Sequence, residues 1–294
     1  TAQVNEPKLA VQNKSLSFSQ KRKKLSEQKK KKKAKKQNLK ANNPSQKQLD
    51  SLLEYYQNGR FSDAEKLAVS ITQDFPNHQF AWKVLGAVLE ATGRKSEALD
   101  ANQTAVALSP QDAAAHNNLG ITLQELGRLD EAEVNLMQAI ALKSDFAEAH
   151  YNLGNTLKEL GRLDEALASY NQAIALKSDF AEAHYNLGVT LKELGRLDEA
   201  EASYRQAIAL KSDFAEAHYN MGITLQELGR LDEAEASYTQ AIALKSDFAE
   251  AHIKLLSCLF LLDKQSLFFE KLDYFINEDT ANATIGSLTC RAAL

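Results

Sequence analysis

A 34-residue segment recurs along the chain, and this periodicity restricts the possible folds more than any other feature of the sequence. The fourth copy, at 147–180, returns at 181–214 with three substitutions, and at 215–248 with four relative to the fifth copy. A period of this length is typical of solenoids, in which each repeat is one unit stacked on its neighbours. Looser copies in the same register lie at 113–146, 79–112 and 45–78, and a seventh, at 249–277, loses the pattern after Leu262.

Each period carries the pattern of two amphipathic helices separated by a glycine. In the fourth copy, Leu153, Leu157 and Leu160 fall at i, i+4 and i+7, which predicts one buried stripe on a first helix. Gly161 is expected to end that helix as its C-cap. Asp164 is expected to begin the second helix as its N-cap. The inward stripe predicted for the second helix comprises Ala166, Tyr170, Ala173 and Ile174.

The start of the first helix has the spacing of a capping box. Asp145 is expected to accept hydrogen bonds from backbone N–H groups, and Glu148 to reach back to the cap. The absence of a side chain at Gly154 lets a neighbouring helix approach closely, and Tyr170 is expected to fill the space between hairpins. One hairpin cannot bury both of its apolar stripes, so each hairpin must stack on the next. An extended array of helices is therefore predicted.

Fixed residue types recur within the period: Leu-Gly at positions 7 and 8, alanine at 20, an aromatic residue at 24 and alanine at 27. This pattern resembles the tetratricopeptide-repeat signature over roughly residues 45–277. The resemblance implies an all-α, right-handed solenoid of stacked helix-turn-helix hairpins, with six full repeats and a divergent seventh. It also implies a protein-protein interaction scaffold whose first helices line a concave groove.

The chain departs from the family pattern at two positions. Histidine replaces the usual aromatic residue at position 4, and serine replaces the usual proline at position 32. Equivalent positions of successive first helices are expected to lie about two helix diameters apart, too far for histidines to share a zinc ion through bonds of about 2 Å. We therefore expect packing histidines, no metal site and no cofactor. The histidines are His116, His150, His184, His218 and His252, and the serines are Ser144, Ser178, Ser212 and Ser246.

Charge divides the chain near Pro44. Residues 1–50 carry 15 Lys+Arg and 3 acidic residues, a net of +12, which leaves 35 − 15 = 20 basic and 39 − 3 = 36 acidic residues in the remainder, a net of −16. For the basic run at 21–36, three interpretations stay open: a solvated leader, sequence-independent contact with nucleic acid or an anionic membrane surface, and a nuclear localisation signal. The expected parts are a disordered leader at 1–44, the array at 45–277, and a tail or capping helix at 278–294 that looks truncated.

Several function classes are disfavoured. The two cysteines, Cys258 and Cys290, have no paired spacing, which disfavours a disulfide framework and favours a reducing, cytoplasmic setting. No apolar run of about 18 residues is present, so no transmembrane segment is predicted. The recurring Gly-Arg-Leu-Asp-Glu has one glycine, whereas a phosphate cradle needs several adjacent backbone N–H groups. We expect no catalytic residues and no enzyme activity in this chain.

Asparagine at position 6 is the most informative candidate for ligand binding. It stands in the middle of a first helix, where asparagine is unfavourable, and beside the buried residue at position 7. An amide offers a donor and an acceptor to a peptide backbone, and the ladder resembles that in the arrays of O-linked N-acetylglucosamine transferases. The alternative is that recent duplications copied one tolerated residue. With tyrosines at position 5 and lysines at 12, the predicted peptide-binding residues are Asn118, Asn152, Asn186, Asn220, Tyr151, Tyr185, Tyr219, Lys158 and Lys192.

Two functions are compatible with these features. The preferred one is a scaffold that binds an extended peptide or a partner domain in its concave groove. The alternative is the substrate-recruiting arm of a larger enzyme, because some bacterial proteins with similar repeats continue into an oxygenase-like or transferase-like domain. The sequence beyond Leu294 in the intact protein would separate the two.

Overall fold

The structure, a computed structural model, describes residues 43–278. The predictions for the leader at 1–42, including its anionic partners, and for the tail beyond Glu278 lie outside the described residues. Within 43–278 there are fourteen α-helices and no strand. The first helices of successive hairpins are α2 (Gln46–Gln57), α4 (Gln79–Ala91), α6 (Ala113–Glu125), α8 (Ala147–Glu159), α10 (Ala181–Glu193), α12 (Ala215–Glu227) and α14 (Ala249–Leu261). The second helices are α3 (Phe61–Asp74), α5 (Lys95–Leu108), α7 (Leu129–Leu142), α9 (Leu163–Leu176), α11 (Leu197–Leu210), α13 (Leu231–Leu244) and α15 (Gln265–Glu278).

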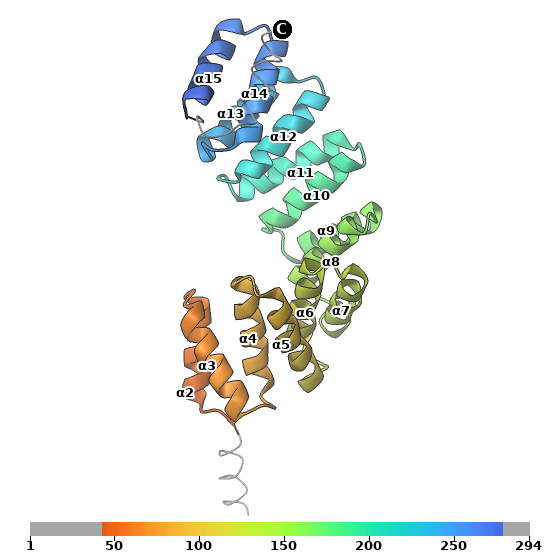
Figure 1. Cartoon of the computed structure of the whole chain (residues 1–294). Helices are drawn as coiled ribbons and strands as arrows, with labels where there is room; N and C mark the ends of the chain where they lie inside the picture. Colours follow the sequence, from red (N-terminus) through yellow and green to blue (C-terminus); the bar gives the residue numbers. More distant parts are fainter. Residues whose placement is uncertain (1–42, 279–294) are drawn as a thin grey trace, which may run out of the picture.

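The hairpins stack into one elongated array (Figure 1). Each second helix from α3 to α13 packs on the first helix of its own hairpin and on that of the next, as α9 does with α8 and α10. First helices also contact one another along the array, whereas the described second helices make no comparable contacts among themselves. The first helices therefore form the shorter, inner side of a curved array, and the second helices form the outer side. The predicted all-α solenoid of helical hairpins is confirmed.

Successive first helices lie closer than the sequence analysis assumed. α8 contacts both α6 and α10, so the expected separation of two helix diameters is wrong. Side chains of neighbouring first helices even meet directly, since Asn186 Nδ2 donates to Tyr151 OH at 3.0 Å. The fully buried alanines at position 3, such as Ala149 and Ala183, leave no bulk to hold the helices further apart.

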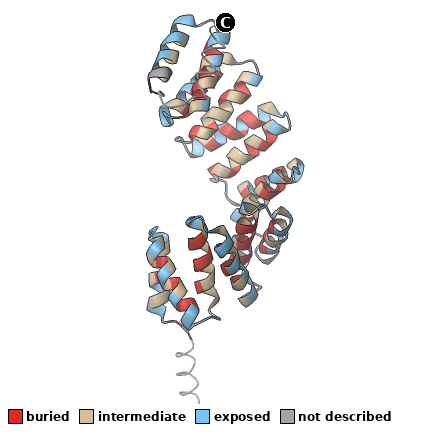
Figure 2. Cartoon of the chain, in the orientation of Figure 1, coloured by how far each residue is buried: buried red, intermediate tan, exposed pale blue. Residues whose placement is uncertain are grey.

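Alanines and one tyrosine build the core of a typical hairpin. Ala166, Tyr170 and Ala173 are fully buried, and Figure 2 shows buried residues along the facing sides of the helices. Glycine is required opposite the tyrosine, because a Cβ at Gly154 would lie 2.6 Å from Tyr170 Cε1. Gly161 has φ +75°, a left-handed conformation that favours glycine, and it ends the first helix as predicted, directly after Leu160.

The predicted capping box at the start of α8 is wrong. Phe146, rather than Asp145, occupies the N-cap position, and no side chain caps the helix. Glu148 instead lies 3.6 Å from Lys177 Nζ across the hairpin. The phenylalanine ring at this position is half-buried, with Lys143 Nζ 4.7 Å from its centroid, and burying half of such a ring contributes about 1 kcal/mol, which is comparable with a typical cap.

The second helix also begins earlier than predicted. α9 starts at Leu163 with Arg162 at its N-cap position, so Asp164 lies in the first turn instead of at the cap. Arg162 Nη2 lies 2.5 Å from Glu165 Oε2, which ties the preceding turn to the helix. In the first turn, the negative charge of Asp164 still stabilises the helix, because it lies near the positive end of the helix dipole.

The histidines at position 4 contact the turn that precedes their own helix. Nε2 of His150 lies 3.3 Å from the carbonyl oxygen of Ser144, and Nε2 of His252 lies 2.9 Å from that of Ser246. These contacts link the two positions at which the sequence departs from its family and explain the histidines without a metal. Among residues 43–278, no group of three or more His, Cys, Asp or Glu side chains could hold a metal ion.

Candidate peptide-binding face

We call the surface that first helices α4 to α14 present on the shorter side of the array the inner face. The nine predicted binding residues all lie on α6, α8, α10 and α12, and all nine are half-buried. They come from equivalent positions of adjacent helices, so the structure arranges them as parallel rows. Whether they bind a ligand stays a prediction.

The asparagines at position 6 form a ladder of hydrogen bonds between neighbouring first helices. Asn152 Nδ2 donates to Asn117 Oδ1 at 2.9 Å, and Asn220 Nδ2 donates to Tyr185 OH at 2.9 Å. Asn186 Nδ2 donates both to Tyr151 OH and to Asn155 Oδ1. The N–H half of these three amides is therefore used inside the array. No hydrogen bond in the described region uses their Oδ1 atoms.

The tyrosines at position 5 pack between hairpins. The ring centroid of Tyr151 lies 6.1 Å from that of Tyr170 and 4.8 Å from that of Phe180. The same two contacts recur for Tyr185 and Tyr219. Burial raises the pKa of the Tyr151 hydroxyl above its usual value. These rings thus stabilise each junction, and Tyr151 and Tyr185 also orient the amides of the following repeat.

Position 9, which the sequence analysis did not single out, supplies the partner of the buried tyrosine at position 24 in the fourth repeat. Asn155 Oδ1 accepts from Tyr170 OH at 2.9 Å. The next repeat has Val189 there, and the fully buried Tyr204 hydroxyl has no hydrogen-bond partner. In the sixth repeat Gln226, at position 12, accepts from Tyr238 OH at 2.8 Å. The only sequence signal was that position 9 varies among otherwise similar repeats.

The two predicted lysines remain available for contact. Lys158 and Lys192 take part in no ion pair within the described region. At the equivalent position of the third repeat, Gln124 Nε2 donates to Glu159 Oε1 at 2.6 Å. The inner face therefore combines amide oxygens, unpaired cations and exposed carboxylates, a mixture suited to polar contact with a peptide.

A buried polar cluster between the second and third repeats was not predicted. Asn102, fully buried, stands where the fourth to sixth repeats have tyrosine, and its Nδ2 donates to Thr122 Oγ1 at 2.9 Å. Thr122 Oγ1 in turn donates to Glu90 Oε2 at 3.1 Å. Burial raises the pKa of the Glu90 carboxyl to about 7. The cause is the short asparagine, which leaves room for the Glu90 carboxylate to enter the junction.

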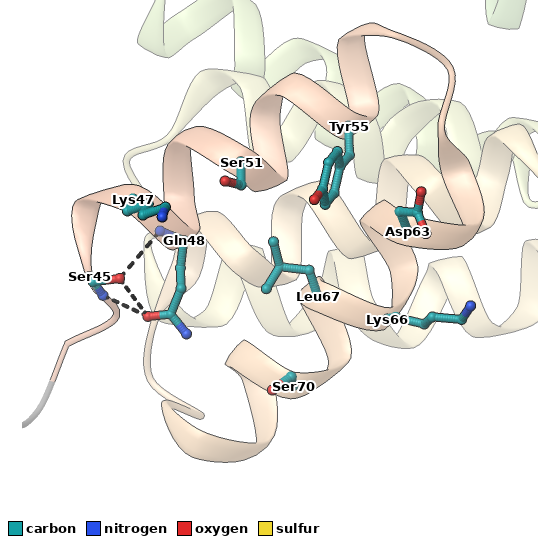
Figure 3. Close-up of a pocket in the computed structure, with 9 residues that line it drawn as sticks. All are labelled: Ser45, Lys47, Gln48, Ser51, Tyr55, Asp63, Lys66, Leu67 and Ser70. Atoms are coloured by element: carbon teal, nitrogen blue, oxygen red, sulfur yellow. Dashed lines mark hydrogen bonds between the residues drawn. The ribbon is translucent and has the colours of Figure 1, made fainter.

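A hollow of about 470 Å³ lies between α2 and α3, at the end of the array (Figure 3). Within residues 43–278 no helix precedes α2, so no hairpin of the described region covers this face. Ser45 begins α2 with a capping box, in which Gln48 N–H lies 3.3 Å from Ser45 Oγ and Ser45 N–H lies 2.9 Å from Gln48 Oε1. The hollow is open and lined mainly by the carbon atoms of long or polar side chains, and its lining comprises Ser45, Lys47, Gln48, Ser51, Tyr55, Asp63, Lys66, Leu67 and Ser70.

No helix in residues 43–278 combines the length and apolar character needed to cross a membrane. The cytoplasmic location inferred from the cysteines stays a prediction.

The fold has many counterparts among solved structures. A chain of the APC/C Cut9–Hcn1 hetero-tetramer matches with a TM-score of 0.66 and 19% identity. The match covers 72% of the present chain and only 42% of the length of that chain. TTC0263 of Thermus thermophilus, a thermophilic TPR protein, gives a TM-score of 0.51 and 27% identity, covering 62% of this chain and 99% of that one. YrrB, described as a TPR protein with an unusual peptide-binding site, gives 0.51 and 22%, covering 63% and 95%.

Family models agree with these structural matches. A comparison with curated protein sequences finds no match. The TPR repeat model matches residues 123–161, 154–195 and 190–229, and further tetratricopeptide repeat models match 215–248, 49–113 and 101–134. Together these matches run without a gap from residue 49 to residue 248, and tetratricopeptide arrays serve as protein-interaction scaffolds. The chain belongs to the tetratricopeptide-repeat family.

Proposed function

We propose that the inner face binds an extended peptide segment of a partner protein. The observation that carries this proposal is the asparagine ladder. Because the Nδ2 atoms of Asn152, Asn186 and Asn220 donate to the preceding first helix, these three amides cannot rotate freely and each Oδ1 is held in one direction. A row of fixed acceptors suits the backbone N–H groups of an extended chain, and it costs little ordering entropy when the ligand binds.

The spacing of the first helices supports the same proposal. Packed helices lie about 8–10 Å apart, and an extended chain advances about 3.3 Å per residue. One repeat therefore corresponds to about three peptide residues, which is one turn of a polyproline II chain, so N–H groups three residues apart point the same way, towards successive Oδ1 atoms. YrrB shows by its description that this fold can carry a peptide-binding site; at its level of identity, that likeness extends to the fold alone.

Peptides selected from a random 12-residue display library on the full chain provide the test. The inner-face variant combines Asn118→Ala, Lys158→Ala and Lys192→Ala. Neither the side chain of Asn118 nor the two lysines make a hydrogen bond or ion pair within the described region, so the fold should be preserved. Each lost contact is expected to cost about 0.5–1.5 kcal/mol, so affinity should fall roughly ten-fold or more.

The matched control combines Gln138→Ala, Gln172→Ala and Gln206→Ala, three exposed positions on the outer helices. Fluorescence polarisation with the best selected peptide should give an unchanged Kd for this control. Equal losses in both triple variants, or unchanged affinity in the inner-face variant, would contradict the proposal.

A further inference from the structure

A row of carboxylates ends the first helices on the inner face. Glu125, Glu159, Glu193 and Glu227, which we call the inner acidic row, are each the last residue of their helix and are exposed. The helix dipole places its negative pole at that end, so a negative side chain there is unfavourable. Local helix stability thus disfavours glutamate at all four positions, and a cation bound beside the row would remove that cost.

The array neutralises this row only in part. Glu125 Oε2 lies 3.2 Å from Lys95 Nζ, and Glu159 accepts from the amide of Gln124. Glu193 and Glu227 take part in no ion pair within residues 43–278. Lys158 and Lys192 each stand one residue before a member of the row and offset part of its charge. No lysine stands before Glu227, so the excess of negative charge is greatest at α12.

An orphaned hydroxyl marks the same part of the inner face. Tyr204 is fully buried and its hydroxyl has no hydrogen-bond partner. The hydroxyls of Tyr170 and Tyr238 bond inner-face residues, so that of Tyr204 is aimed at the corresponding place on α10. Burial, with Tyr185, Glu193 and Glu227 nearby, raises the pKa of Tyr204. An unsatisfied buried polar group costs about 1–3 kcal/mol, so a ligand that donates N–H there gains affinity.

We propose that the inner acidic row is occupied by residues 21–36 of this chain, which lie outside the described residues. This inference rests on the proposed function, because it places the leader on the same face as the peptide. The segment carries eleven Lys or Arg residues and one acidic residue, Glu27. The described array and the leader have opposite net charges, and the covalent link between them raises the effective concentration of the leader.

The length of the connection permits this contact. Eight residues separate Lys36 from Ser45, at the start of α2, and the nine steps between the two can span up to about 30 Å. Measured from the start of α2, the C-terminal end of α6 lies about 18 Å away along the helix axis and two helix spacings of about 8–10 Å away across it. The direct distance is therefore about 25 Å. The sixteen residues of the segment can extend over about 50 Å, enough to pass from α6 to α12. The leader would therefore compete with any partner peptide for the inner face.

Trypsin cleavage within 21–36 tests the contact, because the protease cuts after the lysines and arginines concerned. One variant of the full chain replaces all four members of the inner acidic row by glutamine. A matched control replaces Asp145, Asp179, Asp213 and Asp247, four exposed turn residues, by asparagine. Exposed ion pairs contribute about 0.2–1 kcal/mol each, so the first variant should be cleaved roughly ten-fold faster than wild type. The turn variant should match wild type, and 0.5 M NaCl should abolish the protection, as expected from a Debye length of about 3–10 Å.

Two further measurements identify the occupant. Protection that is independent of protein concentration indicates the leader of the same chain, whereas protection that grows with concentration indicates a second copy and overturns the proposal. Carbodiimide crosslinks in the wild-type chain should join lysines of 21–36 to the inner acidic row rather than to the turn aspartates. If the leader is cleaved equally fast in wild type and both variants while selected peptides still bind, the leader contact is wrong and the proposed function stands.

Discussion

Glu90 should make the stability of the second repeat depend on pH. Its carboxyl pKa is raised from 4.5 to about 7 by burial. Below pH 4.5 the group is protonated in both the folded and the unfolded chain, so it contributes no pH dependence. Between about pH 4.5 and 7 only the folded chain keeps the proton, so this stabilisation is lost as the pH rises.

The substitution Glu90→Gln should remove this dependence. The raised pKa corresponds to about 3 kcal/mol at 1.36 kcal/mol per pH unit, which we reduce to about 1–2 kcal/mol because the side chain is only partly buried and water screens it. The amide oxygen introduced by this substitution could still accept from Thr122, so the two proteins should be similar near pH 5. At pH 8 the variant should be the more stable by about 1–2 kcal/mol.

Trp82 provides a local assay. It is the single tryptophan of the chain and lies on α4, the helix that carries Glu90. A local signal is needed because repeat arrays do not always unfold as one unit. Urea unfolding followed by Trp82 fluorescence at pH 5, 6, 7 and 8 would compare wild type, Glu90→Gln and the exposed control Glu159→Gln. Parallel pH profiles for wild type and Glu90→Gln would refute the burial argument.

Two other outcomes are expected from the packing. Gly154→Ala should destabilise the array by about 1–3 kcal/mol, because the new Cβ would meet the buried Tyr170 ring at 2.6 Å. Thermal unfolding of this variant and of the exposed control Gln172→Ala measures the effect. An unchanged melting temperature for Gly154→Ala would contradict the observed close approach. Metal chelators should leave the melting temperature unchanged, since the position-4 histidines bond backbone carbonyls of the preceding turn; a fall reversed by zinc would contradict that assignment.

Periodicity was sufficient to predict the fold because every buried position repeats. Ala166, Tyr170 and Ala173 were predicted to face inward and are fully buried, and Gly161 ends its helix as expected. A 34-residue register fixes which residues are equivalent, so one correct interpretation applies to the whole array. Helix starts were less predictable, because Phe146 occupies the N-cap position although the neighbouring Asp145 has the better capping side chain.

The use of the candidate site residues could not be read from the sequence, because it depends on contacts between repeats. The ladder of asparagines was recognised, but the donors of Asn152 and Asn186 are directed at the preceding helix and only their oxygens remain. The tyrosines at position 5 also pack within the array, as Tyr151 does between Tyr170 and Phe180, and their predicted contact with a peptide stays a prediction.

Because the repeats are nearly identical, they differ from one another only through the few positions at which the sequence varies. The fourth, fifth and sixth repeats share the buried tyrosine at position 24, yet its hydroxyl bonds Asn155 in one, Gln226 in another and no group in the third. The residues that cause this difference, at positions 9 and 12, both lie on the inner face. If the proposed function holds, substitution at these two positions changes the polar groups presented to a ligand while the buried alanines and tyrosines that stack the helices stay the same. Val189→Asn should give the Tyr204 hydroxyl a partner, as Asn155 does for Tyr170, and so remove the orphaned group from the inner face while leaving the array intact.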